Sequence, residues 1–569
     1  MKTRLLIVIY FFLMVVSCKG TESDENTDQT APEIISTNPV NNAVNVPVET
    51  EISVQYSENI RIDGNYKITI NDNPVVVSVY QNALKIVYPL LLRNNYMLKI
   101  SDKSIKDNSG NYASAYALKF STNVGDTTIL EAEDAMFSSG LSIENSIKGY
   151  SGSGYVGTFT AISDTLTFKL NTYSKGDYDL YISYTTGNWG AKKASIMVNE
   201  ASGELELTAS AGFNKMKYAS VKLTDGLNTI KIAPGWTYFA IDYLQLLPSN
   251  HQETPFNIAA TLVNPNASTE AINLYNFLKD NFGKKVISGT MANYSTNKAE
   301  AEWVFENTEK YPALIGLDLI DYTRNWTWVN YSELVTNAVN QWTNNGLVTL
   351  MWHWRDPSNT THEFYTEKTT FDITKINDPN SDQYKAMVAD IDVIAGYLKQ
   401  LKDAGVPVLW RPLHEAAGGW FWWGAKGPEP CKTLWKLMYN RLVNYHGLNN
   451  LIWVWTMEPD AQAANWYPGN EYVDIVGLDI YPGENKHGSQ YVKFFKTKEI
   501  TQGTKLITLS ECGSVPDPLY MQQYGDMWMW FMPWNNDFTR SNKHNGTAWW
   551  NKFFTYDFVL TRDKMPVIK

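Results

Sequence analysis

The chain has 569 residues, of which 44% are hydrophobic and 19% charged, so it is long enough for several domains with buried cores. Its net charge of −11 argues against nucleic acid or an anionic membrane surface as a partner. The 21 tryptophans and 34 tyrosines exceed ordinary usage and are concentrated in the second half. This excess has two explanations, a large aromatic core or platforms for the C–H faces of sugar rings.

The N-terminus has the pattern of a targeting segment. Lys2 and Arg4 precede an apolar run over residues 5–17 that is too short to span a bilayer. The run ends in Val-Val-Ser-Cys, which resembles the lipobox of bacterial lipoproteins. Residues 1–18 are therefore expected to be a signal peptide and Cys18 a lipid anchor. The alternative is an ordinary secretory signal with an incidental cysteine.

The segment after Cys18, residues 19–31, is polar and contains no core-forming run, which predicts a flexible tether. Its acidic start resembles the surface-export signals of Bacteroidetes lipoproteins. That resemblance implies an outer-membrane lipoprotein exposed at the cell surface.

Residues 32–124 are predicted to form a β-sandwich. Alternating runs at residues 51–56, 66–70 and 84–88 are separated by turn sequences such as Asn-Asp-Asn at 71–73. The segment resembles the bacterial Ig-like domains that act as spacers on secreted enzymes. It contains no convergent chemistry, so a spacer is the expected role.

Residues 127–248 also have the pattern of an all-β domain. The opening Leu-Glu-Ala-Glu-Asp-Ala, the central Gly-Ser-Gly-Tyr-Val and the closing Ala-Ile-Asp-Tyr-Leu resemble carbohydrate-binding modules of family 35 and the related family 6. Two loop residues, Trp189 and Trp236, are the candidates for sugar contact. Each could equally cap the core of the sandwich.

Three carboxylates of this domain form a candidate metal site. Glu131 and Glu133 occupy alternate positions of an expected strand and would point the same way. With Asp242 and a backbone carbonyl near Ser153 they could form an oxygen cage for Ca²⁺, an ion that is structural in the resembled family. Solvated carboxylates on an edge strand are the alternative.

A polar linker leads to residues 256–569, where apolar runs alternate with amphipathic helical patterns, among them Ser332–Asn345, Ser381–Ala404 and Pro430–His446. Eight strands with helical crossovers predict a (β/α)8 TIM barrel, in which function lies at the C-terminal strand ends. The predicted strands are Lys285–Gly289, Ala313–Ile320, Leu347–Trp354, Val406–Glu415, Leu451–Met457, Val473–Tyr481, Leu506–Glu511 and Met527–Trp534.

Two glutamates end apolar runs of this region. Glu415 precedes a segment rich in tryptophan, and Glu511 ends the run that begins at Leu506. The end of a buried strand has no structural use for a carboxylate, because desolvating a charge is costly. Two carboxylates beside aromatic surface are what cleavage of a glycosidic bond requires. The sequence therefore predicts an enzyme that acts on a polysaccharide.

Three motifs, at residues 411–423, 476–481 and 509–511, resemble glycoside hydrolase family 26, whose members are mostly retaining β-mannanases. The resemblance covers the whole third region and implies that Glu415 is the acid/base and Glu511 the nucleophile. His414 stands where the wider clan usually has an asparagine, which favours this family. The chain departs from many relatives at Ala416 and Ala417, where they carry polar residues.

The resemblance also implies substrate-binding roles. Trp420 would stack on the sugar at the cleavage position, and His353 and His414 would bind hydroxyl groups beside it, unless the histidines are satisfied core residues. Four further residues belong to this predicted set: Trp423, Asp479 as a positioning group, Tyr481 as a partner of Glu511 or of the ring oxygen, and Arg411 as a partner of a carboxylate.

The sequence thus predicts a retaining endo-β-1,4-mannanase, active as a monomer on mannan or galactomannan and without a cofactor for catalysis. A β-1,3-xylanase or mixed-linkage glucanase of the same family, and a non-catalytic surface glycan-binding lipoprotein, are the alternatives. The remaining cysteines, Cys431 and Cys512, fit no disulfide or zinc pattern.

Overall fold

A computed structural model describes residues 28–46, 50–90, 94–122, 128–172, 175–249, 254–293, 298–321, 332–458 and 462–568. The predicted signal peptide, Cys18 and most of the predicted tether lie outside these residues. The chain divides into two compact units, residues 1–126 and residues 127–569. Within the described ranges, the structure has no helix of the length and apolar character needed to cross a membrane.

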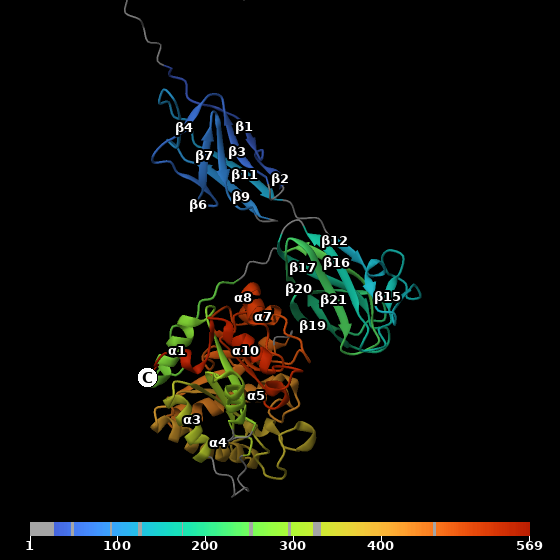
Figure 1. Ribbon diagram of the computed structural model, residues 1–569, viewed down its shortest axis with the longest axis vertical. Coiled ribbons are helices and arrows are strands. Elements are labelled where there is room, and N and C mark those ends of the chain that lie inside the picture. Colours follow the sequence, from blue (N-terminus) through green and yellow to red (C-terminus); the bar gives the residue numbers. More distant parts are fainter. Residues whose placement is uncertain are drawn as a thin grey trace, which may run out of the picture. The chain divides into compact units, whose positions relative to one another are not determined.

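The first unit is all-β, as predicted, and is coloured blue in Figure 1. Its strands bury alternate residues, as in β3, where Ile52, Val54 and Tyr56 enter the core. One sheet has the order β1 (Ile34–Asn38), β3 (Ile52–Tyr56), β8 (Ala83–Val87), β7 (Val76–Tyr80). The other has the order β2 (Ala43–Val46), β11 (Tyr116–Thr122), β9 (Asn95–Ile100), β5 (Ile68–Ile70), β6 (Asn73–Pro74), and β10 (Ile105–Asp107) pairs with β4 (Ile60–Ile62).

The second unit begins with a β-sandwich whose two sheets enclose a separate apolar core. The larger sheet has the order β14 (Ser142–Glu144), β15 (Tyr155–Gly157), β22 (Ala240–Pro248), β17 (Gly176–Thr185), β20 (Asn214–Leu223), and β12 (Thr128–Glu131) also pairs with β22. The smaller has the order β13 (Met136–Phe137), β16 (Leu166–Thr172), β21 (Gly226–Pro234), β18 (Lys192–Val198), β19 (Ala201–Leu207). Strands β20 and β19 are thus edge strands.

The rest of the second unit is the predicted barrel of eight parallel strands, closed because β23 pairs with both β24 and β30. All eight predicted strands are present within a few residues of their expected bounds. They are β23 (Val286–Met291), β24 (Leu314–Asp318), β25 (Leu347–Trp352), β26 (Val408–Pro412), β27 (Leu451–Thr456), β28 (Ile475–Ile480), β29 (Leu506–Cys512) and β30 (Trp530–Pro533), and β31 (Val559–Leu560) pairs beside β23.

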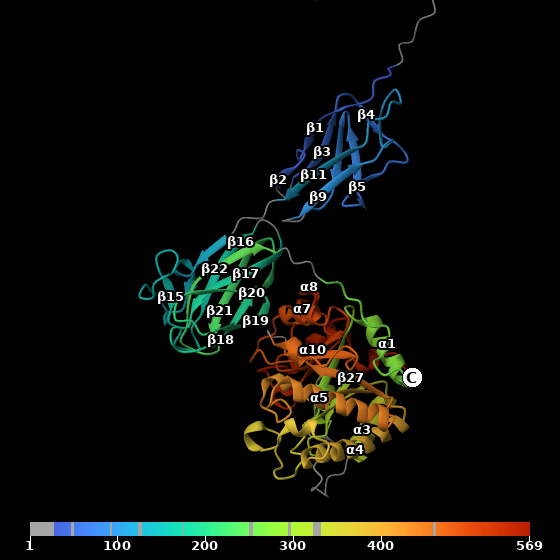
Figure 2. The same cartoon turned by 180° about the vertical axis from the view of Figure 1, so that it is seen from behind.

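Helices surround these strands in both views of the barrel (Figures 1 and 2). The three predicted helices correspond to α3, α4 and α5, the last of which continues as a π-helical turn over Asn440–Tyr445. The helices are α1 (Thr269–Asn281), α2 (Ala299–Thr308), α3 (Ser332–Thr343), α4 (Asp382–Asp403), α5 (Pro428–Tyr439), α6 (Ala463–Trp466), α7 (Tyr491–Ile500), α8 (Pro518–Tyr524), α9 (Asp537–Arg540) and α10 (Thr547–Thr555).

Most of the tryptophan excess serves the core of the barrel. Eleven of the 21 tryptophans are among the largest fully buried side chains, including Trp410, Trp453 and Trp530 on its strands. Burying such rings removes large apolar areas from water. Only a minority of the tryptophans therefore remain as candidates for sugar contact, and Trp189, Trp236 and Trp420 are among those exposed.

Candidate active site

Glu415 lies just beyond the C-terminal end of β26, in a strained segment. Leu413 and Glu415 both have φ of 51°, in the left-handed region that costs energy for residues other than glycine. A short 3-10 turn, Ala416–Gly418, follows, and Gly419 closes it with φ of 71°. With this backbone, one oxygen of Glu415 lies within 4.8 Å of an oxygen of Asp479 and of Glu511.

Glu511 is in β29 and is only 5% exposed. Its two oxygens have separate partners. Arg411 donates from Nη2 to Oε2 at 2.8 Å, and the Tyr481 hydroxyl donates to Oε1 at 2.5 Å. A carboxylate fixed at both oxygens keeps one orientation, which suits a group that must attack from a defined direction.

Arg411 also binds Asp479, so one guanidinium serves two carboxylates. Its Nη1 donates to Oδ2 of Asp479 at 2.8 Å, and the other Asp479 oxygen accepts from the Ser510 hydroxyl at 2.7 Å. A register shift between β28 and β29 pairs Asp479 with Glu511. Bulges commonly redirect side chains near active sites. Here the irregularity lets neighbouring strands present both acidic groups to Arg411.

The two predicted catalytic carboxyl groups lie together. One oxygen each of Glu415, Asp479 and Glu511 lies within 4.8 Å of the other two. Retaining glycosidases have carboxyl groups about 5–5.5 Å apart, whereas inverting enzymes need about 6.5–9.5 Å to admit a water molecule. The close approach of these oxygens favours the shorter, retaining separation over the inverting one.

The surroundings of Glu415 favour its protonated form. Burial raises its pKa, the negative charges of Asp479 and Glu511 raise it further, and Arg411 opposes them only in part. Burial also raises the pKa of Asp479. An acid that keeps its proton at neutral pH is what the first step of glycoside cleavage needs.

The two predicted histidines form a chain that ends at an aspartate. Nδ1 of His353 lies 2.6 Å from Oδ2 of Asp318, at hydrogen-bond distance. Nε2 of His353 lies 3.2 Å from Nε2 of His414. Burial lowers the pKa of His414 well below its usual value, and His353 and Arg411 add to this effect. Nδ1 of His414 has no hydrogen-bond partner among the described residues. This nitrogen is buried, and His414 as a whole is 1% exposed, so its contact with a sugar hydroxyl stays a prediction.

The two tryptophans assigned to substrate differ in their environment. Trp420 is 43% exposed, and its indole N–H donates to Oε2 of Glu415 at 3.1 Å, so its position suits the predicted contact with sugar. Trp423 is fully buried and donates to the carbonyl oxygen of His414 at 2.9 Å. A direct sugar contact by Trp423 therefore does not fit the structure, because no face of the ring is open. Its position supports His414 instead.

The structure brings together Glu415, Glu511, Arg411, Asp479, Tyr481, His353, His414 and Trp420, and their functional roles remain predictions. Two contributing residues were not identified from the sequence: Asp318, which orients His353, and Ser510, which holds Asp479. Asp318 is the last residue of β24, so the rule that polar residues at barrel strand ends serve the site would have found it.

The candidate metal residues of the second sandwich all accept hydrogen bonds from one loop, at Ser151 and Ser153. Glu131 accepts from the Ser151 hydroxyl and Glu133 from the Ser153 N–H, while Asp242 accepts from the Ser151 N–H. One oxygen each of Glu131 and Glu133 is buried without a hydrogen-bond partner in the described residues. The expectation that both lie on one strand is wrong, because β12 ends at Glu131 and Glu133 lies in a 3-10 turn, Ala132–Asp134. Carboxylate oxygens are the ligand type that Ca²⁺ prefers.

The two sugar-contact candidates of this sandwich are exposed. Trp189 and Trp236 are 54% and 55% exposed, so neither is a core cap. Trp189 lies 5.5 Å from the ring of Tyr238, which is also exposed. Aromatic side chains that remain in water in this way are suited to stacking on sugars.

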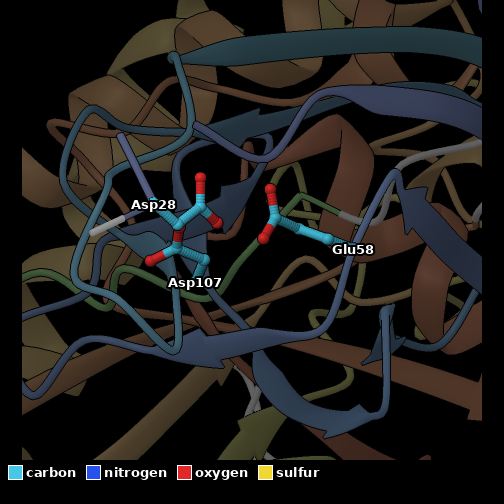
Figure 3. Close-up of side chains that lie close together, drawn as sticks. All are labelled: Asp28, Glu58 and Asp107. Atoms are coloured by element: carbon cyan, nitrogen blue, oxygen red, sulfur yellow. The ribbon is translucent and has the colours of Figure 1, made fainter. Parts of the chain in front are cut away.

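A second carboxylate cluster occurs in the first unit, where the sequence suggested no chemistry. Figure 3 shows Asp28, Glu58 and Asp107 facing one another, and one oxygen of each lies within 4.8 Å of the other two. Asp107 accepts hydrogen bonds from the backbone of Gly110 and Asn111. Its carboxylate therefore orders the turn that follows β10, which is a structural role.

Three family models match the chain. They are Glycosyl hydrolase family 26 over residues 263–564, Carbohydrate binding module (family 35) over residues 128–249, and Bacterial Ig-like domain over residues 28–122. The order of the three matches is that predicted from the sequence.

The chain is also similar to curated and solved proteins. It is 37% identical over 458 residues to a mannan endo-1,4-beta-mannosidase of Thermothelomyces thermophilus, across 77% of this chain and 90% of that protein. Mannan endo-1,4-beta-mannosidase B of Piromyces sp is 33% identical, across 77% of each chain.

Among solved structures, a Podospora anserina β-(1,4)-mannanase with a family 35 module is 38% identical with a TM-score of 0.53, covering 77% of this chain and 98% of that one. A β-mannanase from a symbiotic protist of the termite Reticulitermes speratus, complexed with gluco-manno-oligosaccharide, is 40% identical with a TM-score of 0.53, covering 55% and 99%. With the barrel matched over its length and both glutamates in place at its mouth, the chain belongs to glycoside hydrolase family 26.

Proposed function

We propose that the chain is a retaining endo-β-1,4-mannanase that hydrolyses mannan or galactomannan. The observation that carries the proposal is the short separation of Glu415 and Glu511 at the C-terminal mouth of the barrel. The choice of mannan is supported by the relatives, which are named mannan endo-1,4-beta-mannosidases at 33–37% identity over 77% of the chain.

The first step forms a covalent glycosyl-enzyme. A carboxylate oxygen of Glu511 attacks the anomeric carbon, and the bond from that carbon to the glycosidic oxygen breaks. Glu415 gives its proton to that oxygen, so the leaving sugar departs with a neutral hydroxyl group. Tyr481 and Arg411 hold Glu511 in the attacking orientation.

The second step releases the other part of the chain. Glu415, now a carboxylate, takes a proton from water while the water oxygen attacks the anomeric carbon. The ester to Glu511 breaks, its carboxylate is restored, and Glu415 is protonated again. Two inversions give net retention at the anomeric carbon.

Product analysis on mannan, galactomannan, lichenan and β-1,3-xylan tests the substrate. Cleavage of the first two, with β-anomeric products seen first by NMR, is the expected result. Preference for lichenan or β-1,3-xylan would favour the glucanase or xylanase alternatives. Binding of these polymers without cleavage would favour the non-catalytic alternative, against which the raised pKa of Glu415 already argues.

The second sandwich is proposed to be a sugar-binding module with a structural Ca²⁺. Glu131, Glu133 and Asp242 would hold the ion, which would neutralise their charges and fix the loop at Ser151 and Ser153. Chelation with EDTA should lower the melting temperature of the full chain, and added Ca²⁺ should restore it. Glu133→Ala should remove this dependence, because one ligand is lost. Affinity electrophoresis on mannan with Trp189→Ala and Trp236→Ala tests the sugar contact.

The N-terminal motif supports a proposal about location. Cys18 would carry the lipid anchor of an outer-membrane lipoprotein at the cell surface, where a polysaccharide too large to enter the cell is accessible. Metabolic labelling with a palmitate analogue should mark the wild-type chain and not Cys18→Ser. Labelling of both would refute the anchor at this cysteine.

A further inference from the structure

The second sandwich is fixed to the barrel by backbone contacts. Ser202, in β19, donates its N–H to the carbonyl of Ser489 at 2.8 Å, and Ser489 donates to the carbonyl of Glu200 at 2.9 Å. The adjoining residue Gly488 is needed for this approach, because a Cβ there would lie 2.8 Å from the Glu200 carbonyl oxygen. The start of β19 therefore meets the loop before α7 at a separation that excludes a side chain.

Two barrel tyrosines extend this contact to the other edge strand. The Tyr491 hydroxyl accepts the N–H of Lys222 in β20 at 2.8 Å, and the Tyr524 hydroxyl accepts the N–H of Glu200 at 3.4 Å. The two rings stack with centroids 5.3 Å apart, and Ala201 is buried against them. Both edge strands of the sandwich are thus bound to the wall of the barrel at α7 and α8.

A cavity of about 810 Å³, here called the intermodule cavity, opens between these edge strands and the barrel. This volume lies within the range of about 300–1,000 Å³ that is typical of ligand sites. The lining residues that matter here are Lys193, Glu204, Glu206 and Met216 from the sandwich and Trp420 and Glu458 from the barrel.

Trp420 connects this cavity to the catalytic centre. Its indole donates to Glu415, the acid that protonates the departing oxygen, whereas Glu511 is held by Arg411 and Tyr481. The cavity therefore adjoins the acid and not the nucleophile. Glu458, beyond the end of β27, lines the cavity and also contributes to the raised pKa of Glu415.

The lining of the intermodule cavity suits an uncharged, hydroxyl-rich ligand. Six lysines and five carboxylates line it, so neither sign dominates. Lys193 pairs with Glu204 at 3.0 Å and with Glu206 at 3.8 Å, which leaves polar groups that can donate to and accept from hydroxyls. Met216 and Trp420 add apolar surface for the C–H faces of sugar rings.

We propose that the intermodule cavity extends the substrate cleft on the leaving-group side and binds the reducing-end portion of a β-1,4-linked mannan chain beyond the sugar at Trp420. The inference rests on the proposed function. It assigns strand β18 and the edge strands β19 and β20 of the sandwich a direct part in hydrolysis, separate from the exposed Trp189 and Trp236.

The test uses the full chain and mannohexaose labelled with ¹⁸O at its reducing end. The variant Lys193→Ala with Glu204→Ala removes an ion pair without changing net charge. The matched control, Lys399→Ala with Asp403→Ala, removes an exposed pair from α4. Lys193→Met, which keeps the aliphatic stem, is the second variant, and unchanged melting temperatures verify folding.

The cavity variants should lower kcat/KM about tenfold on mannohexaose, as expected for the loss of one to two hydrogen bonds. They should leave mannotriose unchanged and move cleavage toward the labelled end, because fewer sugars are held beyond Trp420. Equal losses on both substrates, unchanged cleavage positions, or the same change in the control would overturn the proposal. A parent chain that cleaves no mannan would instead refute the proposed function.

Discussion

At the scale of single residues, the catalytic centre depends on one buried cation shared by two acidic groups. Arg411 is 1% exposed and contacts both Asp479 and Glu511 at 2.8 Å. A buried charge must be paired, since the cost of an unpaired one is several kcal/mol. Arg411 is therefore both a structural partner of Asp479 and the group that fixes Glu511. Its burial and its two carboxylate partners match the expected role of Arg411 as a partner of a carboxylate, without direct contact with substrate.

Replacing Glu415 by alanine should lower kcat on mannan by roughly 10²–10⁴-fold, the range that general acid–base catalysis contributes. The loss should be smaller on an aryl mannoside with an activated leaving group, because that substrate does not need the proton. Azide should then restore turnover and give a β-mannosyl azide. Glu511→Ala serves as the contrast, since β-azide should not form without the nucleophile. Retained activity on mannan in either variant would remove the assignment.

The pH profile tests the electrostatics of Glu415. Burial and two neighbouring negative charges raise its pKa, and catalysis requires its protonated form, so activity is lost as pH rises through that pKa. Asp479→Asn removes one negative charge and frees Arg411 to act on Glu415. The alkaline limb of kcat/KM should therefore move to lower pH. Asp403→Asn, at the exposed end of α4, should leave it in place, and an upward shift in Asp479→Asn would contradict the account.

At the scale of elements, the end of β26 carries most of the specialised geometry. The left-handed residues Leu413 and Glu415 and the short turn after them place the acid next to Trp420. Gly418 is required here, because a Cβ at this position would lie 2.1 Å from the Trp420 ring. The loop and the ring thus form one unit with Glu415, the proposed acid.

Gly418→Ala should displace Trp420 and weaken its hydrogen bond to Glu415. A misplacement of about 1 Å near the reacting atoms can cost about 10²-fold, so kcat/KM on mannan should fall about 10- to 100-fold. The matched control is Gly396→Ala in α4, where an added Cβ meets nothing within 4 Å. It should preserve activity, because alanine favours the helix. Equal activity in both variants would mean that Trp420 is not positioned by this turn.

The strands of the barrel were predictable because each is an uninterrupted apolar run between polar helices, as in Leu451–Thr456. The exact ends of the strands were harder to predict. Glu415 was expected to end a strand, but β26 stops at Pro412, since proline and the left-handed residues after it cannot continue the ladder. Glu133 was expected on a strand and lies in a 3-10 turn.

Side-chain environment was harder still to predict than strand position. Trp420 and Trp423 occur in the same motif, yet one is exposed and the other fully buried, and sequence pattern alone does not separate them. The pairing of His353 with Asp318 joins two strands separated by a helix, so neither periodicity nor spacing reveals it.

At the scale of the whole molecule, the second unit is a sandwich and a barrel joined by specific contacts rather than by a linker alone. Glu200 and Ser202 bind Ser489, and Lys222 binds Tyr491. These pairs are far apart along the chain, so the sequence predicted two separate domains and not their contact. A fixed module beside the catalytic mouth can act on the same polysaccharide chain that the barrel cleaves, which raises the effective concentration of substrate at the site.

The proposed mechanism depends above all on a covalent bond between Glu511 and the substrate. Incubation of the full chain with 2-deoxy-2-fluoro-β-mannosyl fluoride should trap this intermediate. The 2-fluorine slows both the formation and the hydrolysis of the glycosyl-enzyme, whereas the good fluoride leaving group keeps its formation fast enough for it to accumulate. Peptide mass spectrometry should find one fluoromannosyl group on Glu511, and Glu511→Ala should carry none. An adduct on another carboxylate, or no adduct together with an inverted anomeric product, would contradict the mechanism.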